Sequence, residues 1–321
     1  MPRLLVSGAI NWDTCFYVKR LPSSGEEVRI KGISRVSGGT GANVAVAAAR
    51  ILEPGEVALV GALGQDELAK VQLDLLEKEG VDTRQVKILP GEESGQAYIL
   101  IEESGQNIIA SYLGANAALR PEHLAGAADL VQACRGMVLT DPPLEVAQAL
   151  LDLAAQAQTP VFWDPGILLE FARERTRELL DRVDTLFLNE SEAIALLGVS
   201  EPESALKQLE AGPLHQVVLK LGARGAALLD LGSAKIIRLP ALPLEKLGLR
   251  VASTVGCGDA FVGAFAAYRV LGAEPREALL LASVAAGLNA TRPETRGSPG
   301  RRALEEVAQR ARELGFAPVE D

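Results

Sequence analysis

An aspartate that follows closely spaced glycines is the residue in this chain best suited to chemistry. Asp259 comes directly after Gly256, Cys257 and Gly258, and an Ala-rich segment that predicts a helix continues from there. Backbone N–H groups at the beginning of a helix converge on an anion, and the helix dipole adds to the attraction. Beside a phosphoryl group, the carboxylate could accept the proton of an attacking hydroxyl. The alternative is structural, with Asp259 as a first-turn charge and the glycines serving packing.

Two further polar segments could bind a polyol. Asn11 and Asp13 follow a predicted strand at residues 4–8, and open α/β sheets bind ligands at the carboxyl ends of their strands. In the segment SGGTGAN, Gly38 and Gly39 permit close approach of the backbone. Asn43 offers both a donor and an acceptor to sugar hydroxyls. Each segment could equally be an ordinary turn or helix start, because Asn, Asp and Gly are common there.

Two segments in the second half of the chain could contact phosphates or a nucleotide. Asn189 and Glu192 begin a predicted helix with the spacing of a capping box. The same pair could instead place Glu192 near a hydrated Mg²⁺ and Asn189 near phosphates. Lys220, Gly222 and Gly225 lie between two predicted strands, which suits either a loop beside a nucleotide or a plain hairpin connection.

Composition excludes several classes of function. The chain has 321 residues and a formal net charge of −10, which disfavours a nucleic acid or an anionic membrane surface as partner. Only His123 and His215 are present, so a histidine triad or a histidine-ligated zinc site has almost no raw material. Cys15, Cys134 and Cys257 are far apart and odd in number, which favours a reducing cytoplasm over a disulfide framework. No apolar run reaches the length of a membrane span without charge, so we expect a cytoplasmic protein.

The elements that must position these residues alternate between short apolar runs and longer helical segments. Such alternation predicts a mostly parallel sheet with helices on both faces. A strand is also expected at residues 249–252, directly before the glycine–aspartate motif. The other expected strands are 4–8, 57–63, 136–140, 160–164, 185–188 and 216–220, and the expected helices are 41–52, 66–79, 144–156, two within 256–290, and 302–314.

Two segments, at about 14–36 and 94–112, break this alternation. Both alternate apolar and polar residues, and turn signals occur at residues 22–25 and 103–105. They predict half-exposed antiparallel strands. A small sheet that projects beside a ligand site is a lid. We therefore expect one domain over residues 1–321 with a β-sheet lid.

The order of the motifs along the chain carries a family resemblance. The sequence resembles the ribokinase family, also called the phosphofructokinase-B type sugar kinases, from about residue 4 to about residue 300. The most specific motif is GCGD at 256–259. The other carrying segments are Gly8 with Asn11 and Asp13, PSSGEE at 22–27, GGTGAN at 38–43, GALGQD at 61–66, GANAAL at 114–119, NESE at 189–192 and KLGARG at 220–225.

The resemblance implies a three-layer α/β sandwich and an ATP-dependent, Mg²⁺-dependent transfer to a hydroxymethyl group. It implies that Asp259 is the base, that Glu192 organises Mg²⁺, and that family members often form homodimers through the lid. The backbone N–H groups of Gly256, Cys257 and Gly258 would form the anion hole. The substrate would be held by Asn11, Asp13, Gly38, Gly39, Asn43 and Asp141, and the nucleotide by Asn189, Lys220, Gly222, Gly225 and Asn289.

Three positions depart from the family pattern. Thr40 replaces the usual Lys of the first glycine motif, and Asp141 is one methylene shorter than the usual Glu. Ser253 replaces the Asp that opens the final motif, an Asp that is tied to the monovalent-cation site in ribokinases. Dependence on a monovalent cation therefore stays open, as does the identity of the sugar.

Three alternatives to a free-sugar kinase remain at this stage. A nucleoside kinase would need an apolar base pocket, which Trp12, Phe16 and Tyr98 of the lid could supply. A phosphosugar kinase would need clustered cations, for which the lid offers Lys19, Arg20, Lys31 and Arg35, although such residues are usually solvated. A non-catalytic sugar-binding protein on the same fold is the third, because a fold does not fix a function.

Overall fold

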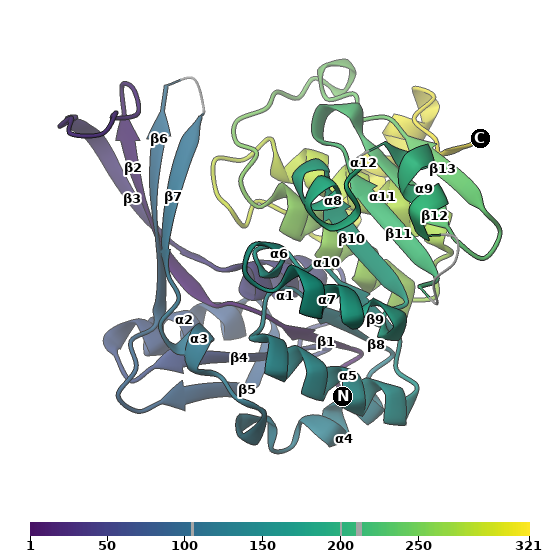
Figure 1. Ribbon diagram of the computed structural model, residues 1–321. Helices are drawn as coiled ribbons and strands as arrows, with labels where there is room; N and C mark the ends of the chain where they lie inside the picture. Colours follow the sequence, from purple (N-terminus) through teal and green to yellow (C-terminus); the bar gives the residue numbers. More distant parts are fainter. Residues whose placement is uncertain (104–105, 200, 210–213) are drawn as a thin grey trace.

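The chain forms one large sheet and one small, separate sheet (Figure 1). The computed structural model describes residues 1–103, 106–199, 201–209 and 214–321. The turn expected at 103–105 therefore lies partly outside the described residues. Within the described part, no helix is both long and apolar enough to cross a membrane.

The large sheet has ten strands in the order β14-β13-β12-β11-β10-β9-β8-β1-β4-β5. In the spatial order β5, β4, β1, β8, β9, β10 and β11, each strand is parallel to the next. The strands β12, β13 and β14 are added antiparallel at one edge. The predicted mostly parallel sheet is confirmed. The bounds are β1 Leu4–Ser7, β4 Val57–Gly64, β5 Val81–Leu89, β8 Gly136–Leu139, β9 Val161–Trp163, β10 Thr185–Asn189, β11 Gln216–Lys220, β12 Ala226–Asp230, β13 Lys235–Leu239 and β14 Val319–Glu320.

Alternation along the strands divides the core into two layers. In β1, Leu4 and Val6 face one core cluster while Leu5 faces the other. Both faces are apolar because successive side chains of a strand point to opposite sides and both sides are covered. The first cluster contains residues of α1 Thr40–Ala49, α2 Glu67–Lys78, α10 Cys257–Val270, α11 Pro275–Asn289 and α12 Arg301–Glu313. The second contains residues of α4 Ala127–Ala133, α5 Leu144–Ala157, α6 Leu168–Phe171, α8 Glu190–Leu197 and α9 Pro202–Leu209.

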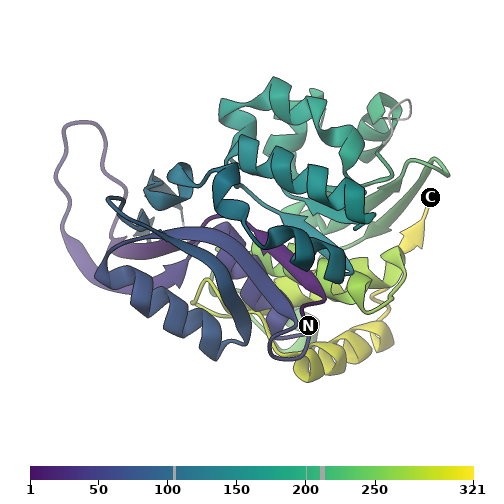
Figure 2. The same cartoon turned by 90° about the horizontal axis from the view of Figure 1, so that it is seen from below.

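These helical layers complete a three-layer α/β sandwich. Figure 2 shows the teal helices on one side of the sheet and the yellow-green helices on the other. Two further short helices are α3 Ala115–Ala118 and α7 Arg173–Glu178. Single 3-10 turns lie at Pro121–Leu124, Leu180–Arg182, Gly222–Arg224 and Glu245–Leu247.

Aromatic packing fixes α10, the helix that carries Asp259, against the sheet. The ring of Phe265 lies edge-on to Phe187 of β10, with centroids 5.2 Å apart, and to Phe162 of β9 at 6.3 Å. Phe265 is fully buried. Truncating such a residue to alanine costs about 3–5 kcal/mol. The beginning of α10 is therefore held at a defined place above the strand ends.

The small sheet is formed by the two segments expected to form a lid, and we call it the lid. Its strands are β2 Asn11–Val18, β3 Ile30–Gly38, β6 Gly95–Glu102 and β7 Asn107–Tyr112, in the order β3-β2-β6-β7. The pair β2–β6 is parallel and the outer pairs are antiparallel. Figure 1 shows these strands projecting away from the helical layers. Asn11 pairs with Gly38 on one side and with Gly95 on the other, so the base of the lid coincides with the first glycine motif.

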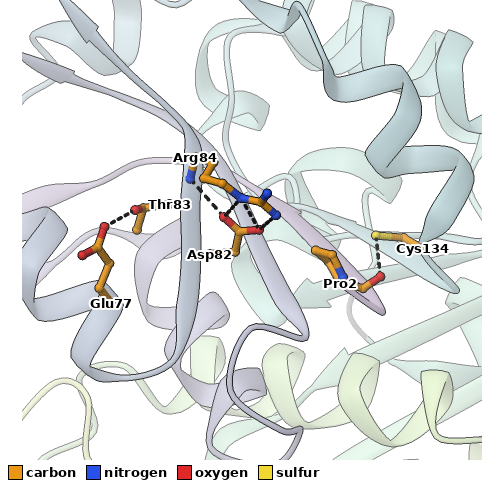
Figure 3. Close-up of polar contacts among 6 residues, drawn as sticks. All are labelled: Pro2, Glu77, Asp82, Thr83, Arg84 and Cys134. Carbon is orange, nitrogen blue, oxygen red and sulfur yellow. Dashed lines mark hydrogen bonds and ion pairs between the residues drawn. The ribbon is translucent and has the colours of Figure 1, made fainter.

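The edge strand β5 lies on the far side of the large sheet from the antiparallel strands. Thr83 of β5 donates a hydrogen bond to Glu77 of α2 at 2.7 Å, and Arg84 pairs with Asp82 on the same strand (Figure 3). Charged side chains on an edge strand discourage pairing with another chain. Cys134 donates its thiol proton to the carbonyl oxygen of Pro2 at 3.6 Å.

The strand expected at residues 249–252 is absent, and that prediction was wrong. The segment is extended, but the N–H groups of Ala252 and Ser253 both donate to the carbonyl oxygen of Ala290, at 2.8 and 3.1 Å. The carbonyl groups at the end of α11 have no partner within the helix, so they accept hydrogen bonds from these two N–H groups, which would otherwise pair with a neighbouring strand. The segment leads into α10 without joining the sheet.

Candidate active site

The beginning of α10 has the geometry of an anion-binding turn. Gly256 is the N-cap residue with a φ of 76°, and a β-carbon there would lie 2.2 Å from the carbonyl oxygen of Thr295. A β-carbon at Gly258 would meet nothing closer than the Nζ of Lys220, at 3.8 Å. The first-turn N–H groups of a helix have no partners within it. That of Cys257 has a long contact of 3.4 Å with the oxygen of Thr254.

Asp259 lies in the first turn of α10, next to this loop. Its Oδ2 accepts a hydrogen bond from the Nδ2 of Asn43 at 2.8 Å, across 216 residues of sequence. Burial raises the pKa of Asp259 to about 7, although the hydrogen bond from Asn43 opposes the rise and the carboxylate of Asp164 adds to it. A general base works best when its pKa is close to the operating pH. Asp259 therefore has the position and the basicity to accept a hydroxyl proton.

A second group of polar residues lies at the base of the lid. Asp13 is buried, and burial raises its pKa to about 6 even though the nearby guanidinium of Arg296 lowers it. A β-carbon at Gly38 would lie 2.0 Å from the Oδ2 of Asp13, so only glycine fits beneath this carboxylate. Gly39 has a φ of 90°, and a β-carbon there would lie 2.6 Å from the backbone nitrogen of Asn11. The glycines allow the motif and the lid base to meet.

Asp141 is tied to both neighbouring motifs. Its Oδ1 accepts hydrogen bonds from the backbone N–H of Ala9 at 3.0 Å and from the hydroxyl of Thr40 at 2.5 Å. The hydroxyl of Thr140 lies 3.1 Å from the same oxygen. The two departures from the family pattern, at Thr40 and Asp141, therefore contact each other. The side chains of Thr40 and Asp141 are both shorter than the Lys and Glu of the family pattern.

Two residues that the sequence did not single out hold Asn11. The Nδ2 of Asn116 donates to the Oδ1 of Asn11 at 2.9 Å and to the oxygen of Ile10 at 3.1 Å. The fully buried Gln72 of α2 donates to the backbone oxygen of Asn11 at 2.5 Å. Asn116 lies within the motif GANAAL, so a signal was available. Gln72 has none, because a glutamine in an amphipathic helix is usually solvated.

A cavity of about 380 Å³ opens on the other side of the anion-binding turn. Lys220, Gly222 and Gly225 border it. Its walls are largely apolar, which suits the flat face of a nucleobase. A β-carbon at Gly225 would lie 2.0 Å from the oxygen of Leu239, so this glycine allows two backbone segments to approach. The other lining residues include Leu242, Leu244, Val251, Phe261, Ser283, Ala286 and Ala290.

Charged residues meet at the floor of the site, between the cavity and Asp259. The ammonium group of Lys220 pairs with Asp164, and both side chains are nearly buried. Burial lowers the pKa of Lys220, but the carboxylates of Asp164 and Glu192 outweigh it and hold that pKa above its usual value. Burial, and then Asp164, raise the pKa of Glu192. Asp164 is the last residue of the strand predicted at 160–164, where a carboxylate could have been noticed.

The expected nucleotide ligands Asn189 and Asn289 lie apart from the cavity wall. Asn189 and Glu192 form a reciprocal capping box, with contacts of 2.7 and 2.9 Å. Asn289 is buried, and its Nδ2 donates to the oxygen of Val255 at 3.1 Å, behind the anion-binding turn. Both therefore shape backbone segments that border the site.

Comparisons with known proteins agree with this arrangement. The description of the pfkB family of carbohydrate kinases fits residues 1–300. The chain is 31% identical over 298 residues to a ribokinase of Arabidopsis thaliana, covering 89% of this chain and 76% of that protein. It is 29% identical over 301 residues to an ATP-dependent ribose-1-phosphate kinase of Halopiger xanaduensis, covering 93% and 95%. The structure of Arabidopsis thaliana ribokinase complexed with ribose and ATP matches with a TM-score of 0.84 and 29% identity, covering 96% and 99%.

The chain therefore belongs to the pfkB family of carbohydrate kinases. It has the ribokinase-like fold, and it is an ATP-dependent sugar kinase. The family resemblance, the fold class and the enzyme class expected from the sequence are confirmed.

Proposed function

We propose that this chain transfers the γ-phosphoryl group of ATP to the hydroxymethyl group of a free sugar, with a pentose of the ribose type as the first candidate. The observation that carries the proposal is the 2.8 Å contact between Asn43 and Asp259. A sugar hydroxyl bound beside Asn43 lies next to the carboxylate that can deprotonate it. The Asn11–Asp13 pair at the base of the lid supplies further partners for a polyol.

The residues divide the reaction between them. Asp259 accepts the proton of the attacking hydroxyl, which becomes a better nucleophile as the bond to phosphorus forms. The backbone N–H groups of Gly256, Cys257 and Gly258 form the anion hole that stabilises the charge of the transferring group. Lys220 lies close enough to Gly258 to add its positive charge. The lid excludes water, which would otherwise compete as an acceptor.

The residues near Lys220 fit a magnesium ion that accompanies ATP. Burial and the carboxylate of Asp164 raise the pKa of Glu192, and the ammonium group of Lys220 only partly offsets the rise. Carboxylate oxygens in this arrangement suit a hard, hydrated cation. We propose that these two carboxylates hold the hydrated Mg²⁺, which when bound neutralises phosphate charge.

The lid surface disfavours the two alternative acceptors. Trp12 and Phe16 alternate with Asn11 and Asp13 along β2, so they lie on the opposite face of the strand from the sugar-binding residues. Tyr98 pairs with Thr14, which lies on the same face of the lid as Trp12 and Phe16. The three aromatic side chains therefore do not form a base pocket over the sugar site.

The lid cations, required for a phosphosugar acceptor, are exposed. Arg20 pairs with Glu26, and Lys31 pairs with Glu103. The charges of Arg20 and Lys31 are therefore already compensated at the surface, which disfavours a phosphate site built on these two residues. Retention of Asp259 in a half-buried, hydrogen-bonded position also disfavours a non-catalytic binding protein.

We further propose a homodimer that forms through the lid. Ile33 pairs with Phe16, Ile108 pairs with Leu100, and all four share one face of the lid. Ile33 and Ile108 are each 50% exposed. An apolar sheet face of this kind is a candidate interface, and a second copy of the lid supplies a face of matching shape and polarity. The three free cysteines support the cytoplasm as the compartment.

The experiment is a coupled assay with Mg²⁺ and ATP against ribose, other free sugars, nucleosides and fructose 6-phosphate. Turnover of a free sugar is the expected result. Turnover of nucleosides or of the phosphosugar alone would retain the Asp259 chemistry but overturn the proposed acceptor. No turnover with any acceptor would overturn the proposed reaction.

A further inference from the structure

Arg296 is a half-buried cation that the sequence did not single out. It lies in the segment between α11 and α12. Its Nε donates to the Oδ1 of Asn43 at 2.9 Å, and its Nη2 donates to the backbone oxygen of Gly38 at 3.1 Å. Arg50 holds the backbone here, because its Nη1 donates to the carbonyl oxygens of Arg296 and Ser298 at 2.7 and 2.6 Å. The guanidinium is therefore held from behind and directed toward the first glycine motif.

The contact with Arg296 decides which way the amide of Asn43 points. A guanidinium has donors and no acceptor, so Asn43 must turn its oxygen toward Arg296. Its Nδ2 then faces Asp259, to which it donates at 2.8 Å. A flipped amide would place an oxygen against the carboxylate and an NH₂ group against the guanidinium, and both contacts would be repulsive. Arg296, Asn43 and Asp259 thus form a directional chain of hydrogen bonds.

The charged groups around this chain of hydrogen bonds favour the same arrangement. Burial lowers the pKa of Arg296 to about 10, which leaves it charged at neutral pH, and the carboxylates of Asp13 and Asp259 favour that charge. In return, Arg296 favours the ionised form of Asp13. The other charged or titratable groups facing these residues are Asp164, Lys220, Asp141 and Cys257 around Asp259, and Glu79 and Arg50 around Arg296.

We propose that Arg296 is a positioning residue for phosphoryl transfer, which fixes the Asn43 amide so that it donates to the catalytic carboxylate of Asp259. The proposal rests on the proposed function, since it assigns Asp259 as the base. It predicts that Arg296 acts through Asn43, without contacting the transferring group. Its loss should lower kcat more than it raises KM for ATP.

The first test compares Arg296→Met and Arg296→Lys with wild type and with Arg292→Met. Arg292 has an exposed side chain on the same segment, so its substitution removes equal charge without touching the chain of hydrogen bonds. Arg296→Met should lose about 10²-fold in kcat, the effect of a misplaced catalytic group. Arg296→Lys, which keeps the charge and one donor, should recover part of the loss. Arg292→Met should resemble wild type. A kcat for Arg296→Met within about twofold of wild type would overturn the proposal.

A double-mutant cycle separates positioning from a direct effect. If Arg296 acts through Asn43, then Arg296→Met should cost little more in an Asn43→Ala background, because coupled residues are not additive. Losses that multiply would overturn the proposed route through Asn43. Melting temperatures of all variants show whether each is folded, and Arg296→Lys keeps the test available if Arg296→Met is not.

A readout without turnover distinguishes failure of this inference from failure of the proposed function. Protein labelled with ¹³C at the Asp carboxyl groups is titrated by NMR, and the Asp259 signal is identified by its loss in Asp259→Asn. The pKa of Asp259 should be higher in Arg296→Met than in wild type or Arg292→Met, since a donor and a cation are weakened together. An unchanged pKa would overturn the inference. If wild type shows no turnover with any acceptor, the proposed function fails while the titration still decides the role of Arg296.

Discussion

In the proposed reaction, the half-buried carboxylate of Asp259 is the group that accepts the proton. Replacing it with Asn keeps the shape of the side chain and removes the proton acceptor. Asp259→Asn should therefore lower kcat by about 10²–10⁴-fold, the usual effect of losing one positioned base. Steady-state kinetics with the best acceptor checks this. A loss of less than about tenfold would show that another group takes the proton.

The same substitution should affect stability in a pH-dependent way. The pKa of Asp259 is about 7 in the folded protein and close to the ordinary value of 3.8 when the chain is unfolded. The unfolded chain therefore releases its proton first, and the native state loses stability as the pH rises from about 4 to about 7. Asp259→Asn avoids this cost. Its melting temperature should exceed that of wild type by more at pH 8 than at pH 5. An equal difference at both values would contradict the raised pKa.

Gly258 tests the anion-binding turn without disturbing the fold. A β-carbon at this position would meet only the Nζ of Lys220, at 3.8 Å, so a side chain can begin here without contacting the backbone of another segment. It would fill the space between the turn and Lys220. Gly258→Val should lower kcat by about 10²-fold, comparable to the loss of an oxyanion donor, and should leave the melting temperature nearly unchanged. Gly232→Val, in a distant turn, is the control. Wild-type kcat in Gly258→Val would exclude the turn from phosphoryl transfer.

At the scale of elements, the lid gives the next prediction. Replacing both Ile33 and Ile108 with Glu places charges on the proposed interface. Light scattering should show a dimer for wild type and a monomer for the double variant. Ile194→Glu is the matched control, because Ile194 is 55% exposed on α8, away from the lid. A wild-type protein that is monomeric at all concentrations tested would contradict the proposed interface.

The elements themselves were largely predictable from local pattern. The expected strand at 57–63 is β4 Val57–Gly64, and the expected helix at 66–79 is α2 Glu67–Lys78. Each has a strong apolar period and a clear boundary, including Asp66, which caps α2 by accepting from Ala69. The strand predicted at 249–252 is absent because tertiary packing decides whether these residues pair with a neighbouring strand or with the end of α11. No local pattern carries that information.

At the scale of the whole molecule, the site depends on contacts between distant segments. The glycine–aspartate motif was visible in the sequence because its residues are adjacent. Arg296 was not, since an arginine in a segment rich in Gly and Pro has the pattern of a solvated loop. It contacts Gly38 across 258 residues of sequence. The role of Gln72 was not predictable for the same reason, because only the tertiary fold brings it next to Asn11.

Because Asn11 pairs with both Gly38 and Gly95, the ends of the two lid segments lie together, and the lid could be exchanged as a unit. Residues 11–38 and 95–112 leave the large sheet side by side, so two inserts with matched ends could replace them. Asp259, Lys220 and the proposed nucleotide-binding cavity lie outside both inserts. A chimera that borrows these two segments from a relative would inherit part of its acceptor preference while keeping the same catalytic base. Recombination within the family could thus change what is phosphorylated separately from how it is phosphorylated.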